Sequence, residues 1–167
     1  MTVIRRDEAP DPETFNANQC KNALLAYFRF KRGYPYVATE YLECDVVAAK
    51  SSEWIEVEVK ISWADYCAEW KKDKHKEGMF RCDYDGKYCP NKKYFAAPPK
   101  LAQRIAQDCA DHHPEYGVIS ICSEELANYL RNAKTLHTNH PNQKTLDGIV
   151  ARITSELITL RRKLRAA

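Results

Sequence analysis

The segment from Trp54 to Lys60 reads W-I-E-V-E-V-K, and its strict alternation constrains the fold more than any other feature of the chain. Successive side chains of a strand point to opposite faces, so Glu56, Glu58 and Lys60 are expected on one face. The three β-branched residues between them then form the other face, which must be covered by another layer. The segment therefore predicts a strand of a layered sheet, with charged groups gathered on one side.

The preceding apolar segment carries a carboxylate, Asp45, at the start of the run V-V-A-A. Ser51 and Ser52 mark a turn, so this segment and the next are expected to pair as an antiparallel hairpin. A carboxylate in a strand that packs in the core is expected to have a cationic partner, because burying an unpaired charge is costly. We therefore predict that Asp45 and Glu58 lie across the hairpin and share one hard cation.

This arrangement favours hydrolysis of a phosphate ester. Mg²⁺ takes oxygen ligands, uses one or two carboxylates, and leaves its other positions to water and phosphate. The backbone carbonyl of Val59 is a candidate further ligand. Lys60 is expected to face the same site, where it can orient or deprotonate water or neutralise charge on the phosphate. The E-x-K motif alone is equally compatible with a strand face exposed to water. The longer pattern of an aspartate, a hairpin turn and then E-x-K is more specific for a metal site.

The remaining pattern predicts a mixed α/β sheet with helices on both faces. Residues 1–13 are expected to be a flexible lead-in, and residues 14–167 a single domain. The two later strands, separated by one helix, should run parallel. The expected strands cover residues 36–49, 54–61, 94–97 and 116–122, and the expected helices cover residues 14–32, 63–76, 101–110, 124–133 and 146–164.

The charge of the chain does not by itself identify a partner: 26 Lys and Arg oppose 23 Asp and Glu, a net charge of +3. Its distribution is more informative, because a basic segment follows directly after the E-x-K strand. We expect this segment to contact the phosphate backbone of DNA, with a solvated helix end as the alternative. The proposed nucleic-acid-binding residues are Lys71, Lys72, Lys74 and Lys76.

Seven cysteines are present without any C-x-x-C pair. Together with the lack of an apolar leader or a bilayer-length apolar run, this predicts a cytoplasmic protein without membrane contact, whose cysteines are isolated thiols. A zinc or iron–sulfur site built on Cys82, Cys89, Cys109 and Cys122 is the less favoured alternative.

The arrangement Asp45…Glu58-Val59-Lys60 resembles the PD-(D/E)xK nuclease superfamily, and the chain is most similar to the MmcB-like DNA-repair endonucleases and related phage and bacterial proteins. The resemblance runs over about residues 17–122, through the segments A-T-E-Y-L-E-C-D-V-V-A, E-V-K-I-S-W-A-D-Y, Y-F-A-A-P-P and E-Y-G-V-I. It implies a restriction-endonuclease-like mixed β-sheet core flanked by helices. It also implies Mg²⁺-dependent cleavage of DNA in repair or in phage and mobile-element processing, with Mn²⁺ as a substitute ion. Asp45 and Glu58 become metal ligands, and Lys60 becomes the catalytic lysine.

One position departs from that family. Many members carry a metal-binding glutamate in the first helix, whereas this stretch offers amides, and Glu13 lies further upstream. Glu40 or Glu43 is a candidate replacement. The alternative function is therefore a nucleic-acid-binding protein that keeps the nuclease fold with weak or no catalysis. A homodimer is left open, because no interface is evident.

Overall fold

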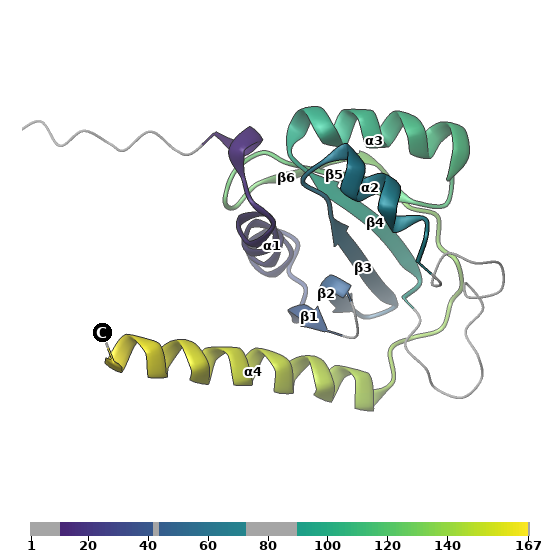
Figure 1. The fold of residues 1–167 in the computed structure, drawn as a ribbon. Helices are drawn as coiled ribbons and strands as arrows, with labels where there is room; N and C mark the ends of the chain where they lie inside the picture. The colour runs from purple at the N-terminus through teal and green to yellow at the C-terminus, as the bar shows by residue number, and fades with distance from the viewer. Residues whose placement is uncertain (1–10, 42–43, 73–89, 167) are drawn as a thin grey trace, which may run out of the picture.

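The computed structural model describes residues 11–41, 44–72 and 90–166, which form one six-stranded mixed sheet with helices on both faces (Figure 1). The strands lie side by side in chain order, from β1 to β6. The first three strands pair antiparallel, β3–β4 and β4–β5 pair parallel, and β6 closes the sheet antiparallel to β5. The strands are β1 Tyr36–Tyr41, β2 Cys44–Lys50, β3 Glu53–Val59, β4 Lys92–Ala97, β5 Gly117–Ile121 and β6 Ala127–Arg131.

The helices are α1 Ala17–Ala26, α2 Trp63–Glu69, α3 Pro99–His112 and α4 Gln143–Ala166, with short helical segments η1 Pro12–Thr14 and η2 Tyr27–Lys31. Asn16 begins α1 with a capping box, since its side chain accepts from the backbone of Gln19 and the Gln19 side chain accepts in return. The predicted helix over residues 14–32 is thus confirmed in its main part. Gly33 follows it at a φ of 67°, a left-handed conformation that glycine adopts without steric cost.

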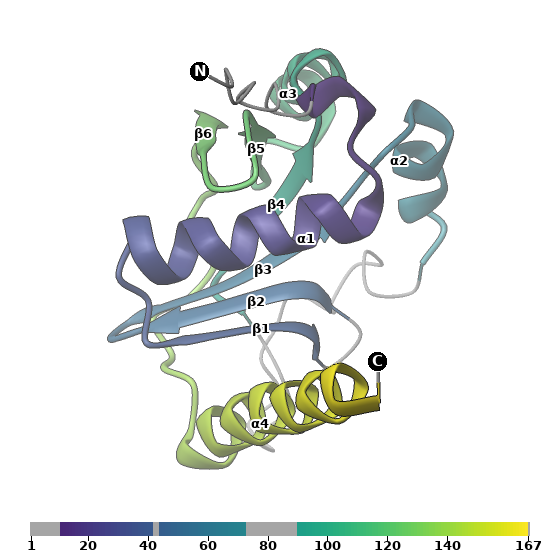
Figure 2. The same ribbon diagram turned by 90° about the vertical axis from the view of Figure 1, so that its left-hand side faces the viewer.

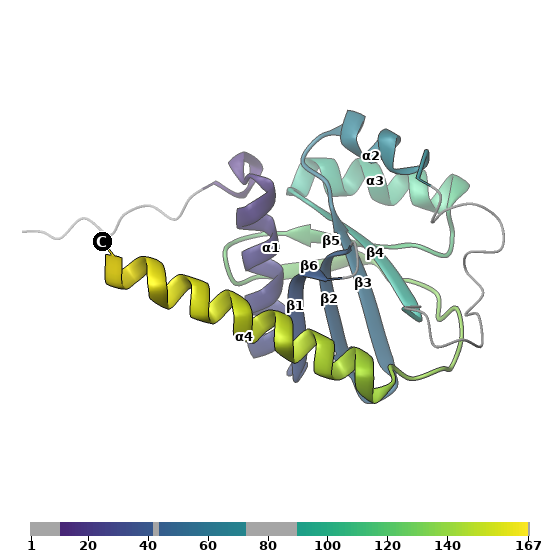
Figure 3. The same ribbon diagram turned by 60° about the horizontal axis from the view of Figure 1, so that its bottom comes forward.

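The helices divide the core into three parts. Helix α1 covers one face of the sheet (Figure 2). Leu24 of α1 and Phe28 of η2 share a buried cluster there with Val57 and Ile119. On the other face, α2 and α3 bury an aromatic cluster that includes Tyr66 and Phe95. Helix α4 packs along β1 and β2 (Figure 3). Its residue Ile149 is fully buried. The part of the chain that the structure describes contains no helix that is both long and apolar enough to cross a bilayer.

The alternation of residues 54–60 predicts the faces of β3 correctly. Ile55, Val57 and Val59 lie in the core beneath α1. Glu56 and Glu58 alternate with them, and their register partners Lys93 and Phe95 lie on the face that carries α2 and α3. The predicted hairpin of β2 with β3 and the parallel pairing of β4 with β5 are likewise confirmed.

Two predicted elements are wrong, and a third is correct in type but too long. Residues 36–49 form two antiparallel strands, not one, because the chain turns back after Glu40, whose φ is 52°, and Tyr41 pairs with Cys44. Helix α2 ends at Glu69, so it is shorter than predicted. The helix predicted over residues 124–133 is instead a turn followed by β6. The Ser123 hydroxyl accepts from the backbone N–H of Leu126, which folds the chain back onto β5.

Candidate active site

A group of buried charged side chains lies on the α2 face of the sheet, around the end of β3. The side chains of Glu56, Glu58, Lys60, Glu69 and Lys93 are each at most 8% exposed, and we call them the buried charge cluster. They come from β3, the residue that follows it, α2 and β4. Moving an ionised group from water into the protein interior costs several kcal/mol, and only well-paired charges offset this cost. Such a cluster adds little to the stability of the fold, which makes it a candidate functional site.

Lys60 lies at the centre of the cluster. Its Nζ donates to Oε2 of Glu69 at 2.6 Å, and lies 3.8 Å from Asp65 and 3.9 Å from Glu58. Its backbone N–H donates to the carbonyl of Ala96, which continues the pairing of β3 with β4. The ammonium group is therefore fixed beside the Glu58 carboxylate by both its backbone and its side chain.

Helix α2 supplies the partner that holds Lys60. Ser62 accepts from the backbone N–H of Asp65 and so begins the helix directly after the strand, as the sequence predicts. Tyr66 then packs against Phe95 in the core, at a ring-centroid distance of 5.1 Å. This contact fixes the helix so that Glu69, one turn later, is fully buried against Lys60.

Lys72 lies between the buried charge cluster and the solvent. Its Nζ lies 2.5 Å from Glu69 and 3.8 Å from Glu58, while its side chain is 52% exposed. Of the four predicted phosphate-contacting lysines, Lys72 thus lies at the cluster and Lys71 is exposed beside it. Lys74 and Lys76 lie outside the described residues.

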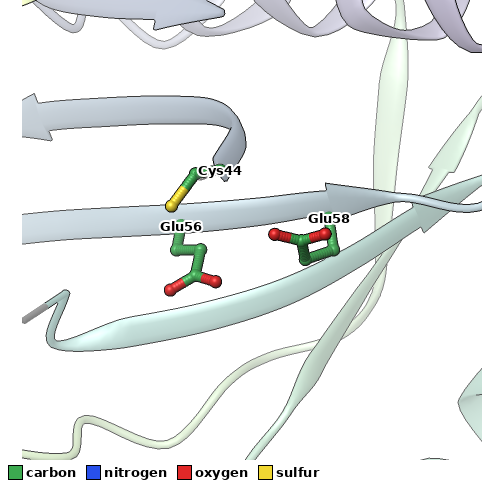
Figure 4. A group of neighbouring side chains, drawn as sticks. All are labelled: Cys44, Glu56 and Glu58. Carbon is green, nitrogen blue, oxygen red and sulfur yellow. The ribbon is translucent and has the colours of Figure 1, made fainter. Parts of the chain in front are cut away.

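Glu56 and Glu58 form a candidate metal site with Cys44. Both carboxylates point to the same side of β3, and the Cys44 thiol reaches them from the start of β2 (Figure 4). One ligand atom from each residue lies within 4.8 Å of the other two. Among the described residues, this is the one group of three histidine, cysteine or acidic side chains close enough to hold an ion together.

Asp45 is not part of that group. Its Oδ2 accepts from the backbone N–H of Val59 at 2.9 Å, and its Oδ1 lies 2.7 Å from Nζ of Lys21 on α1. Glu40 also pairs with Lys21. The structure therefore turns the Asp45 carboxylate toward α1, whereas Glu58 faces Lys60 and α2. Asp45 and Glu58 lie next to Val46 and Val57, the terminal pair between β2 and β3. Their backbones are therefore neighbours, although their carboxylates have different partners.

The Lys21 ammonium group neutralises the Asp45 carboxylate, the role that the sequence assigns to a metal ion. Burial lowers the pKa of Lys21, but hydrogen bonds and charge from Asp45 and Glu40 outweigh burial and raise the pKa above its usual value. Glu13 and Glu43 are the other acids named with the missing first-helix glutamate. Glu13 accepts from the backbone N–H of Lys100 at the start of α3, and Glu43 lies outside the described residues.

The sequence pattern did not identify Cys44, Glu69 and Lys93 as members of the site. The parallel pairing of β3 with β4 sets Lys93 opposite Glu56, with 3.6 Å between their charged groups. The alternation of β4 in sequence places Lys93 on one face of that strand. It assigns Lys93 to the site only when β4 is known to pair with β3. Glu69 and Lys72 lie three residues apart, a spacing that allows side chains on a helix to pair, but the burial of Glu69 follows from the docking of α2.

The zinc or iron–sulfur alternative involves four cysteines, of which the structure describes Cys109 and Cys122. Cys82 and Cys89 lie outside the described residues. Cys109 is buried between α3 and the sheet, where it contacts the Tyr66 hydroxyl, and burial raises the pKa of its thiol to about 11. That environment favours a protonated core thiol over a metal ligand.

Comparison with known proteins adds information on the fold. No family model matches the chain, and no curated protein matches it. A solved structure described as the SPO1766 protein of unknown function from Silicibacter pomeroyi is similar, with a TM-score of 0.57 and 15% sequence identity. The match covers 91% of this chain and 93% of that chain. The two proteins therefore share a mixed α/β fold over almost their whole lengths, and at this identity the likeness concerns the fold alone.

Proposed function

We propose that the protein is a metal-dependent nuclease that hydrolyses phosphodiester bonds of DNA, in repair or in the processing of phage and mobile-element DNA. The proposal includes a restriction-endonuclease-like form of the observed α/β fold. One observation carries it: Glu58 and Lys60 are both buried, lie 3.9 Å apart on one face of the sheet, and adjoin a second carboxylate and an exposed lysine. Carboxylates beside an ordered ammonium group are the donors that metal-assisted phosphate chemistry requires.

The donor set fits a divalent cation. Glu56 and Glu58 offer two carboxylates, which suits Mg²⁺ or Mn²⁺, whereas the soft Cys44 sulfur suits neither ion well. We propose that Glu56 and Glu58 hold the ion, with the Val59 carbonyl as a further oxygen ligand. When bound, the ion supplies charge neutralisation and an acidified water. Asp45 can become a further ligand only if its ion pair with Lys21 breaks.

Lys60 has the role of a fixed hydrogen-bond donor in this proposal. An ammonium group has three N–H donors, so the bond to Glu69 leaves capacity for a water molecule or a phosphate oxygen. An ammonium group held in place stabilises negative charge that develops on the phosphate without reorganisation during the reaction. Lys72 and Lys71, at the solvent side, are proposed to contact the DNA backbone.

The proposal is tested by incubating the protein with supercoiled, linear and single-stranded DNA in Mg²⁺, Mn²⁺ or EDTA. The expected result is cleavage with either metal and none with EDTA. Lys60→Met is expected to lose at least about 100-fold in rate while it still binds DNA. Lys100→Met, on the exposed start of α3, serves as the matched control and should cleave like the wild type. Cleavage by Lys60→Met at the wild-type rate would contradict the proposal.

A second function, DNA binding without catalysis, is favoured by one observation. Lys21 already pairs with Asp45, so a cation from the chain itself occupies the carboxylate that the sequence assigns to a metal. A protein of this kind would bind DNA in a salt-dependent manner and cleave none of the substrates with Mg²⁺ or Mn²⁺. The same incubation, combined with a DNA-binding measurement by fluorescence anisotropy, distinguishes the two functions.

A further inference from the structure

Helix α4 has an exposed apolar stripe that the fold does not cover. The stripe residues are spaced four, three, four, three and four apart, which is the heptad spacing of a helix that pairs with another helix. From the second member onward they are 38–79% exposed, and the first is partly packed against the sheet. The stripe consists of Leu146, Val150, Ile153, Leu157, Leu160 and Leu164.

The stripe is separate from the side of α4 that contacts the sheet. Thr145, Ile149, Arg152 and Glu156 face the sheet, where Ile149 is fully buried and Arg152 donates to the carbonyl of Thr39 at 3.1 Å. At 100° per residue, this side lies about 90° around the helix axis from the stripe. The heptad pattern is therefore not a consequence of packing within the domain.

The described side chains of α4 that follow Glu156 are not covered by their own domain. Every described side chain from residue 157 to residue 164 is exposed, and the helix extends beyond the sheet in two views (Figures 1 and 3). Isolated helical segments of this length are marginal in water, and stable helices normally bury an apolar face. A helix with exposed leucines in heptad register therefore requires a partner helix.

The charges beside the stripe indicate which partner fits. Glu156 and Arg161 flank the stripe on opposite sides and lie five residues apart, and one Glu156 carboxylate oxygen also accepts from the Thr39 hydroxyl at 3.5 Å. In a parallel pair of identical helices, residues in these positions meet across the interface, so each Glu156 would face Arg161 of the other copy. The stripe is also continuous, through Ile153, with an apolar hollow of about 440 Å³ lined in part by Leu25 and Phe30.

We propose that two copies of this chain associate through α4, with the two stripes packed against each other in parallel. A self-complementary stripe on a twofold axis gives a closed dimer, the commonest form of homo-oligomer. The proposal is independent of the nuclease proposal, because none of its residues belongs to the buried charge cluster. Each can therefore fail without the other.

Sedimentation velocity of the full chain tests the dimer. The wild type is expected to sediment at twice the chain mass of 19.3 kDa at micromolar concentration. Leu157→Glu is expected to raise the dissociation constant at least about 100-fold, because it buries a charge in the interface. Ile158→Glu is the matched control: the two side chains are 48% and 45% exposed, but Ile158 lies outside the stripe, so its dimer should remain.

A charge reversal tests the orientation of the helices. Arg161→Glu would place like charges opposite Glu156 and should weaken the dimer about threefold to tenfold at low salt, an effect that fades as salt rises. Arg162→Glu, on the far side of the helix, should not weaken it. A monomeric wild type, or equal loss of dimer in Leu157→Glu and Ile158→Glu, would overturn the proposal. Equal behaviour of the two arginine variants would overturn the parallel arrangement.

Discussion

Glu69 shows at the scale of single residues how the fold fixes the chemistry of the candidate site. This carboxylate is fully buried and contacts both Lys60 and Lys72, which otherwise differ greatly in exposure. It therefore acts as a positioning residue, since it holds the Lys60 ammonium group beside Glu58. A buried lysine that loses its carboxylate partner keeps the full cost of desolvation.

We expect Glu69→Leu to lower the free energy of unfolding by about 3 kcal/mol, because it leaves Lys60 buried without its nearest partner. Lys72→Met should cost about 1 kcal/mol or less, since this lysine is half exposed. Urea unfolding measures both changes. The double variant Lys60→Met/Glu69→Leu should recover most of the loss, and a cost as small as that of Lys72→Met would show that Glu69 does not hold Lys60.

The candidate site was predictable from sequence only where side chains alternate along one strand. Glu58 and Lys60 were placed correctly on one face because the period of two residues leaves no choice. Asp45 illustrates the limit of this reasoning. Its backbone neighbours Glu58 as expected, but the direction of its carboxylate depends on Lys21, which comes from α1 and is distant in sequence.

At the scale of elements, a close contact fixes α4 on the sheet. Tyr41 of β1 donates its hydroxyl to the carbonyl of Thr145 at 3.2 Å, and its ring lies against Gly148. A Cβ at position 148 would lie 2.9 Å from Cζ of Tyr41 and would also meet its hydroxyl. Glycine therefore allows the close approach of the tyrosine, which a side chain at position 148 would displace, although glycine disfavours a helix.

Gly148→Ala reverses the usual order of helix propensity. Alanine normally stabilises a helix interior by about 1 kcal/mol relative to glycine. Here we expect a loss of about 1–2 kcal/mol in thermal unfolding, because the new methyl group collides with Tyr41. In a Tyr41→Ala background the same change should become neutral or stabilising. A stabilising effect in the wild-type background would mean that α4 does not pack on β1 as described.

Elements with a strong local signal were predicted, and those decided by distant contacts were not. The paired strands β2 and β3 carry their own turn, and α2 carries its own cap. By contrast, residues 124–133 have a composition compatible with a helix, and β6 forms because β5 offers an open edge. Its alternation, with Ala127 buried and Tyr129 half-buried between exposed neighbours, was a signal for an edge strand.

At the scale of the whole molecule, the sheet brings together charged residues from three elements, β3, α2 and β4. Within the described residues, β3, α2 and β4 contribute the acids and lysines of one site, while α1 packs on the opposite face. The site and the α4 stripe lie on different elements. The proposed catalysis and the proposed dimer therefore depend on different residues and can be tested separately.

The most direct measurement compares two glutamates of the same strand in one Mg²⁺-dependent DNA cleavage assay. Glu53, at the start of β3, is engaged by Lys92 and Tyr34, and hydrogen bonds from both hold its pKa below the usual value. It therefore serves as a control outside the buried charge cluster. The account predicts that Glu58→Gln loses at least about 100-fold in cleavage rate, while Glu53→Gln cleaves like the wild type. Equal rates for Glu58→Gln and the wild type would contradict it.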